Sequence, residues 1–162
     1  MTMVGFLTLA QHANAADRRP SLCKRDEVAI FSCSLGRKVV SLCASPDLTE
    51  TAGTMSYRFG RKGAIELEYP AAPVHPRTAF TAGIDSAERG DFVRFSKGEF
   101  TYTLYALVGL RERREEDGLS IARGAKVVRN LKCADFAMGE TAWQLMYRAK
   151  LPADPSQSIA PQ

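Results

Sequence analysis

The chain has 162 residues, which is enough for one domain with its own hydrophobic core. Its 22 lysines and arginines against 18 aspartates and glutamates give a formal charge of +4, and these charges are dispersed along the sequence. A nucleic-acid-binding domain concentrates its positive charge on one face, so we expect no nucleic-acid partner. No stretch after the N-terminus reaches the roughly 18 apolar residues of a membrane-spanning helix.

The first 15 residues have the pattern of a signal-peptide remnant. A short apolar run over residues 4–10 is followed by Ala13-Asn14-Ala15, which has the small-x-small spacing of a signal-peptidase site. The basic residues that begin such a signal are missing, so either the signal begins upstream of Met1 or the segment is a frayed tail. The first alternative predicts a periplasmic or secreted protein.

The segment 27–45 predicts a β-hairpin with a two-residue turn at its centre. This turn places Cys33 opposite Val40 and Cys43 opposite Ile30. Because side chains alternate between the two faces of a strand, Cys33 and Cys43 then point to opposite sides, which disfavours a bond between them. A loop longer by one residue would reverse this expectation.

An even number of cysteines in an exported chain indicates disulfide bonds. The four are Cys23, Cys33, Cys43 and Cys133. A zinc site needs close ligand pairs, whereas the first three cysteines are ten positions apart, so we expect no metal. Four cysteines allow three connectivities, and the hairpin geometry favours those in which Cys33 and Cys43 each bond outside the hairpin.

The segment 55–69 predicts a second hairpin, with a glycine bulge in its loop. Matching apolar residues across it places Arg58 opposite Glu66. Glu66 and Glu68 share a face, as a carboxylate pair in a glycosidase might. Nothing near them in the sequence predicts the desolvation that raises a carboxyl pKa, so we interpret them as a solvated strand face with Arg58 as partner.

The segment 92–105 predicts the clearest hairpin, with a two-residue turn at Lys97-Gly98 that places Phe95 opposite Phe100. The aromatic residues of this hairpin are expected in the core, because a base-stacking platform needs clustered exposed lysines and arginines beside them. Strands at 119–121 and 126–133, and a short helix at 141–147, are expected to follow.

The predicted fold is therefore all-β, a single-domain flattened barrel or sandwich of about eight antiparallel strands with an optional short C-terminal helix. Residues 16–150 form the disulfide-tied β domain. Residues 151–162 are expected to be a disordered tail, because their composition is polar and rich in proline and serine.

Two loops carry the candidate partner-binding residues. The proline-bounded loop 70–77 contains His75, the one histidine that remains if the signal is removed. A lone histidine supports neither a multi-histidine zinc site nor a Ser-His pair, so no catalytic residue is assigned. The loop 110–118 contains three arginines, whose planar guanidinium groups suit carboxylates on a partner. They are Arg111, Arg113 and Arg114.

Several short motifs resemble those of a family of small exported proteobacterial proteins whose activity is uncharacterised. They are FSC at 31–33, SLCAS at 41–45, YRFG at 57–60, IELEYP at 65–70, KGEFTYTLY at 97–105 and LKC at 131–133. This resemblance implies an exported β domain and no particular activity. A looser resemblance is to the bacterial envelope inhibitors of C-type lysozyme, but their inhibitory loop motif is not recognisable, so no residue inherits that role.

We expect a non-enzymatic exported module, without a cofactor, that binds another protein. A sheet scaffold cross-linked by disulfide bonds, with variable loops, suits an inhibitor or an immunity protein against a secreted toxin or hydrolase. The first alternative is a β-barrel that binds a small apolar ligand, and the second is an enzyme of unknown reaction. A strand-lined cavity would favour the apolar ligand, whereas a solid core with an exposed loop patch would favour a protein partner.

The Ala13-Asn14-Ala15 pattern predicts that the exported protein begins near Ala16. Intact-mass measurement of the protein purified from the cell envelope should give a chain that lacks the first 15 residues. Envelope protein that still carries Met1 would contradict cleavage at this site.

Overall fold

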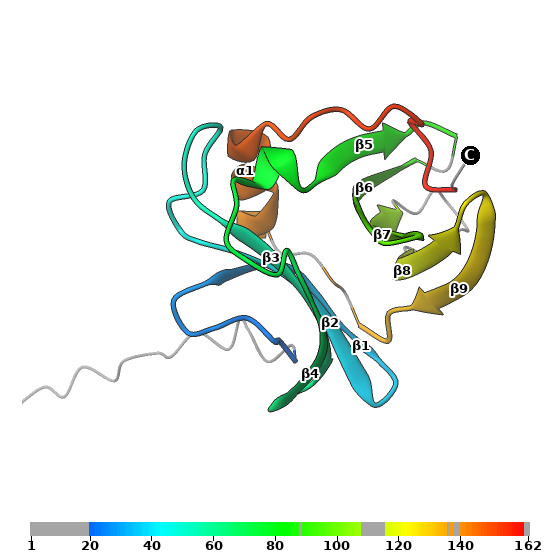
Figure 1. Ribbon diagram of the computed structural model, residues 1–162, viewed down its shortest axis with the longest axis horizontal. Coiled ribbons are helices and arrows are strands. Elements are labelled where there is room, and N and C mark those ends of the chain that lie inside the picture. Colours follow the sequence, from blue (N-terminus) through cyan, green and yellow to red (C-terminus); the bar gives the residue numbers. More distant parts are fainter. Residues whose placement is uncertain (1–19, 88, 108–115, 136, 138–139, 161–162) are drawn as a thin grey trace, which may run out of the picture.

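The computed structural model describes residues 20–87, 89–107, 116–135, 137 and 140–160. Over these residues the chain forms a four-stranded and a five-stranded antiparallel sheet with one short α-helix (Figure 1). The all-β prediction is confirmed. The described strands do not close into one barrel, so the sandwich is the alternative that fits.

Both sheets are meanders, because each strand pairs with its neighbour in sequence. The first sheet contains β1 (Val28–Leu35), β2 (Lys38–Ala44), β3 (Met55–Arg61) and β4 (Ala64–Tyr69). The second sheet contains β5 (Thr81–Asp85), β6 (Gly90–Lys97), β7 (Phe100–Leu107), β8 (Glu116–Arg123) and β9 (Lys126–Lys132). A 3-10 turn, η2 (Pro76–Thr78), precedes β5, and the predicted helix is α1 (Glu140–Ala149).

The first hairpin has the predicted turn but not all of the predicted register. Cys33 lies opposite Val40, as expected, whereas Cys43 lies opposite Ala29 rather than Ile30. A β-bulge between Ala29 and Phe31 causes the difference, since it inserts one extra residue into β1.

The two disulfides both leave this hairpin, as its geometry predicted. Cys23, which precedes β1, bonds Cys43 of β2, and Cys33 of β1 bonds Cys133, which directly follows β9. The second bond closes 100 residues of chain and joins the first sheet to the second. The segment after Cys133 continues along β1 through backbone hydrogen bonds from Ala134 to Ser34 and from Ser32 to Ala137.

The hairpin of β3 and β4 contains the predicted bulge, which lies between Phe59 and Gly60. Its register differs from the prediction by two residues, and Arg58 lies opposite Glu68 instead of Glu66. The prediction required a loop with an odd number of residues, whereas the turn has two, Lys62 and Gly63, and the extra residue of the bulge is Glu66 on β4. Arg58 is nevertheless the cross-strand partner of a β4 glutamate, with 2.8 Å between its Nε and the carboxylate of Glu68.

The hairpin of β6 and β7 turns one residue later than predicted. Its central residues are Gly98 and Glu99, so Lys97 lies opposite Phe100 and Phe95 lies opposite Tyr102. Gly98 has φ of +61°, and the first central position of a tight hairpin turn favours glycine for this reason. The prediction that Phe95 faces Phe100 was therefore wrong, although Phe95 does face the core.

An aromatic cluster fills the space between the sheets at one end of the sandwich. The ring of Phe95 stacks on Tyr102 at 4.9 Å between centroids and on Tyr69 at 4.4 Å. Tyr57 of β3 and Phe80 approach the same ring. The two sheets thus share one core around Phe95, which is 3% exposed.

The C-terminal segment, predicted from its composition as a disordered tail, is described over residues 151–160. It runs along β5, with backbone hydrogen bonds from Ala82 to Pro152 and from Asp154 back to Ala82 (Figure 1). Arg94 of β6 anchors it through a salt bridge of 2.6 Å to Asp154. Composition could not reveal this contact, because the buried partner lies 60 residues away.

We predict that Phe95→Ala lowers the free energy of unfolding by about 3–5 kcal/mol, because it removes the central ring of the cluster. Phe100→Ala is the matched control: Phe100 is half-buried at the end of β7, so its truncation should cost about 1 kcal/mol. Urea unfolding of both variants measures the difference. Equal losses would contradict this register.

Candidate functional site

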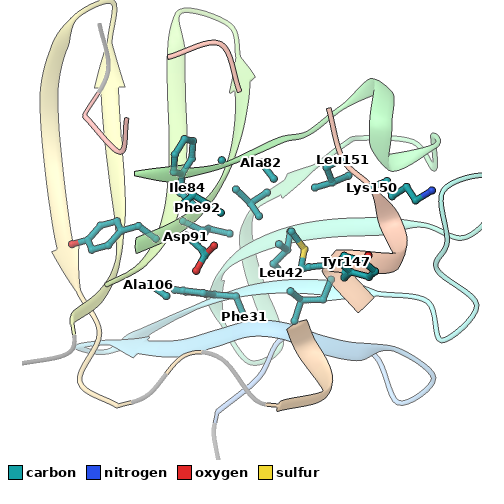
Figure 2. A pocket seen from close by; sticks show the side chains of 16 residues that line it. Phe31, Leu42, Ala82, Ile84, Asp91, Phe92, Ala106, Tyr147, Lys150 and Leu151 are labelled. Carbon is teal, nitrogen blue, oxygen red and sulfur yellow. The ribbon is translucent and has the colours of Figure 1, made fainter. Parts of the chain in front are cut away.

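A pocket of about 430 Å³ lies between the two sheets, at the end of the sandwich away from the aromatic cluster. Figure 2 shows its side chains converging from β1 and β2 on one side, β5–β7 on the other, and α1. Sixteen described residues line it. They are Ile30, Phe31, Leu42, Ala82, Gly83, Ile84, Asp91, Phe92, Val93, Leu104, Tyr105, Ala106, Met146, Tyr147, Lys150 and Leu151.

Local features of the strands shape these walls. The bulge in β1 brings two consecutive apolar residues, Ile30 and Phe31, to the pocket. On the opposite face of the second sheet, Gly83 of β5 leaves room for the ring of Phe92, because a Cβ there would lie 2.5 Å from Cζ of that ring. The side chains of the second sheet that face the first are mainly small or aliphatic, such as Ala106, and they leave the space unfilled.

Two large apolar side chains at the pocket are open to solvent. Ile84 of β5 is 69% exposed, and Tyr147 of α1 is 84% exposed. A contiguous apolar surface that continues into a cavity is typical of a binding site rather than of a random surface residue. The pocket therefore opens to solvent beside β5 and α1, where Figure 2 shows Tyr147 and Lys150 near each other.

Asp91 is the one acidic side chain of the described lining. It lies on β6 between Ile84 of β5 and Ala106 of β7, on the strand face that also carries Val93. Burial raises the pKa of its carboxyl group above the ordinary 3.8. No hydrogen bond or ion pair joins it to any described residue, so the apolar wall contains a half-buried carboxyl group without a protein partner among the described residues.

The basic groups near the pocket are already engaged. Lys150, at the pocket, pairs with Glu50 at 2.8 Å, and Arg77 binds the other oxygen of the same carboxylate. Arg94 lies on the opposite strand face from Asp91, over the ring of Phe92. No basic side chain of the described residues therefore neutralises Asp91.

A second hollow, of about 600 Å³, surrounds Arg94 and the C-terminal segment. Its polar groups bind one another. The guanidinium donates to the side chains of Thr103, Asp154 and Ser156 and to the carbonyls of Ser158 and Ile159. Because the protein itself uses these donors, the bonds of Arg94 hold the C-terminal segment in place. Few hydrogen-bond donors in this hollow are left for a ligand.

The predicted partner-binding residues do not meet at the pocket. Arg111, Arg113 and Arg114 lie outside the described residues. His75 is half-buried before η2, away from the pocket lining, and its Nε2 has no hydrogen-bond partner among the described residues.

The carboxylates and cysteines considered from the sequence are bound to other side chains. Glu66 pairs with Lys38 at 2.6 Å, and Glu68 pairs with Arg58. The described residues contain one cluster with metal-ligand spacing, Cys23, Glu27 and Cys43, but its two sulfurs are bonded to each other. Glu27 itself binds Arg58 through both carboxylate oxygens. These groups stabilise the first sheet.

Sequence reasoning missed Asp91 and the pocket. A signal for Asp91 was present, because strand residues two apart share a face and Asp91 precedes Val93 and Phe95 with that spacing. A carboxyl group on an otherwise apolar strand face is unusual, because aspartate is seldom buried without a partner. The pocket has no such signal, since its walls come from six separate elements.

Comparisons of this chain with protein-family models, curated proteins and solved structures found no match. The resemblance to exported proteobacterial proteins therefore stays a prediction from short motifs. In the part of the chain that the structure describes, no helix has the length and apolar character needed to cross a membrane.

We expect Asp154, which holds the Leu151 segment of the pocket wall in place, to stabilise the fold at neutral pH and less in acid. Burial opposes its ionisation, but hydrogen bonds from Ser156 and Thr81 and the charge of Arg94 outweigh burial and hold its pKa below the ordinary 3.8. Such a group stabilises above its unfolded pKa, and this contribution disappears as the pH falls through the lower folded value.

Asp154→Asn should therefore cost about 3 kcal/mol at neutral pH. Its unfolding free energy should also decline less below about pH 4 than that of the wild type. Urea unfolding across a pH series measures both effects. The control is Asp47→Asn, which removes an exposed carboxylate from a turn. An Asp154→Asn curve parallel to the wild-type curve would contradict the assignment.

Proposed function

We propose that this protein is a non-enzymatic, exported binding protein that holds a small, mainly apolar ligand between its two sheets. The observation that carries the proposal is the apolar pocket of about 430 Å³. Ligand pockets commonly measure about 300–1,000 Å³ and combine apolar walls with a few polar groups. The sequence placed a protein partner first and an apolar ligand second, and the strand-lined cavity favours the second.

The scaffold supports a binding role. The Cys33–Cys133 bond and the shared aromatic core hold the two sheets at a fixed spacing, which favours a preformed cavity. Two disulfides are also compatible with an oxidising, extracytoplasmic compartment. Within the described lining, Asp91 has no hydrogen-bonded second acid, base or nucleophile beside it, so binding explains the site more simply than catalysis.

A protein partner, such as a secreted toxin or hydrolase, remains the second candidate, and β9 favours it. This strand lies at one edge of the five-stranded sheet, where its outer backbone is free to pair among the described residues. It exposes two apolar side chains flanked by basic ones, a composition that suits an acidic extended segment. They are Val127 and Val128, with Lys126, Arg129 and Lys132.

We predict that the purified protein binds the neutral dye N-phenylnaphthylamine with a rise in fluorescence, and that n-octanol displaces the dye. Ala106→Trp should weaken dye binding at least about 10-fold, because the indole would occupy the pocket beside Asp91. A fluorescence titration measures the dissociation constant. The added volume should cost about 1–3 kcal/mol of stability, so folding is checked by circular dichroism.

The matched control is Ala71→Trp, which adds the same side chain at an exposed loop position outside the pocket lining. It should bind the dye as the wild type does. Val127→Glu tests the second candidate: it should leave dye binding unchanged and weaken capture of a protein partner from envelope extract. Absence of dye binding by the folded wild type, or equal affinity in Ala106→Trp, would contradict the proposal.

A further inference from the structure

We infer that the ligand is an apolar primary amine, whose ammonium group binds the Asp91 carboxylate while its chain or ring occupies the pocket. This inference rests on the proposed function and adds the chemical class of the ligand. Asp91 carries the inference because it is the one acidic group of the described lining and has no partner among the described residues.

The cost of leaving Asp91 unpaired favours a cationic ligand. A buried or half-buried carboxylate loses hydration, and a partner that donates hydrogen bonds restores its interactions. The strand positions beside it on either side are Ile84 and Ala106, neither of which has a side chain that donates a hydrogen bond. An ammonium group supplies three donors and the opposite charge.

The protein supplies no competing cation to Asp91. Lys150 also belongs to the lining, but its ammonium group is 2.8 Å from Glu50, and 64% of its side chain is exposed. Arg94 comes from the same strand but points to the other face, where Asp154 binds it. A ligand cation would therefore meet a free carboxylate rather than displace an internal ion pair.

The rest of the lining selects the remainder of the ligand. Toward the first sheet it consists of Ile30, Phe31 and Leu42, and toward α1 it continues to Met146 and Leu151. Each of these walls would contact hydrocarbon favourably and leave a second polar group unsatisfied. The arrangement thus fits a molecule with one amine and one apolar body better than a sugar, a nucleotide or a polyamine.

The test compares ligands of equal chain length that differ only in the head group. Isothermal titration or dye displacement at neutral pH and low salt gives the affinities of n-octylamine, n-octanol and octanoate. For the wild type, n-octylamine should bind about 10- to 100-fold more tightly than n-octanol, as expected for one charge-assisted hydrogen-bonded pair. Octanoate should bind least, because its charge matches that of Asp91.

Asp91→Asn keeps nearly the same shape and removes the charge, so it should bind n-octylamine and n-octanol with similar affinity. The affinity for n-octanol itself should change less than about 3-fold, since the apolar walls are unchanged. The control is Asp47→Asn, whose carboxylate is exposed and outside the pocket lining, and which should retain the wild-type preference for the amine.

Three results would overturn the inference. In the wild type, n-octanol or octanoate could bind as tightly as n-octylamine. This result would agree with an apolar binding site but contradict the inference that its ligand is an amine. A folded Asp91→Asn variant could keep the full preference, which would place the ammonium elsewhere. If none of the three ligands binds, the proposed function itself fails, and the inference fails with it. The wild-type comparison alone decides the matter if Asp91→Asn does not fold.

Discussion

The cross-link between Cys33 and Cys133 is the constraint on which the arrangement of the two sheets depends. Each sheet is a meander whose strands find their neighbours locally, so hairpin pairing alone does not position one sheet against the other. The bond joins β1 to the end of β9 and closes 100 residues, a loop for which chain entropy alone gives about 4–5 kcal/mol. Backbone hydrogen bonds between β1 and residues 134–137 extend the same junction.

The pocket follows from how these two sheets meet. Large aromatic rings around Phe95 fill one end of the interface, whereas the other end has small side chains such as Ala82 and Ala106. Sheets about 10 Å apart need large side chains to fill the space between them, so small ones leave a cavity. An empty apolar cavity costs stability, and Asp91 in its wall adds a desolvation penalty. Both features support the proposal that the pocket binds a ligand, because natural folds keep such local costs mainly at functional sites.

The C-terminal segment completes the pocket through one buried ion pair. Arg94 and Asp154 are each surrounded by protein, and such a pair persists only when its remaining donors and acceptors are also satisfied. Ser156, Thr81 and the carbonyls of residues 158 and 159 provide those bonds. The segment thereby covers the outer edge of β5, which protects that edge from pairing with another chain. It also carries Leu151 to the pocket.

The sequence by itself determined the all-β class, the turn of the first hairpin, the bulge near Gly60, the short helix and the fact that Cys33 and Cys43 bond outside their hairpin. These features follow from period-two alternation, turn chemistry and cysteine spacing, which act over a few residues. Only the tertiary structure decided the exact registers, the path of residues 151–160 along β5 and the place of Asp91 in the pocket wall. A one-residue change in a turn, as at Gly98, moves every cross-strand pair, and no local pattern excludes it. The pocket and the Arg94–Asp154 pair join residues far apart in the chain, so their chemistry exists only once the sheets have packed.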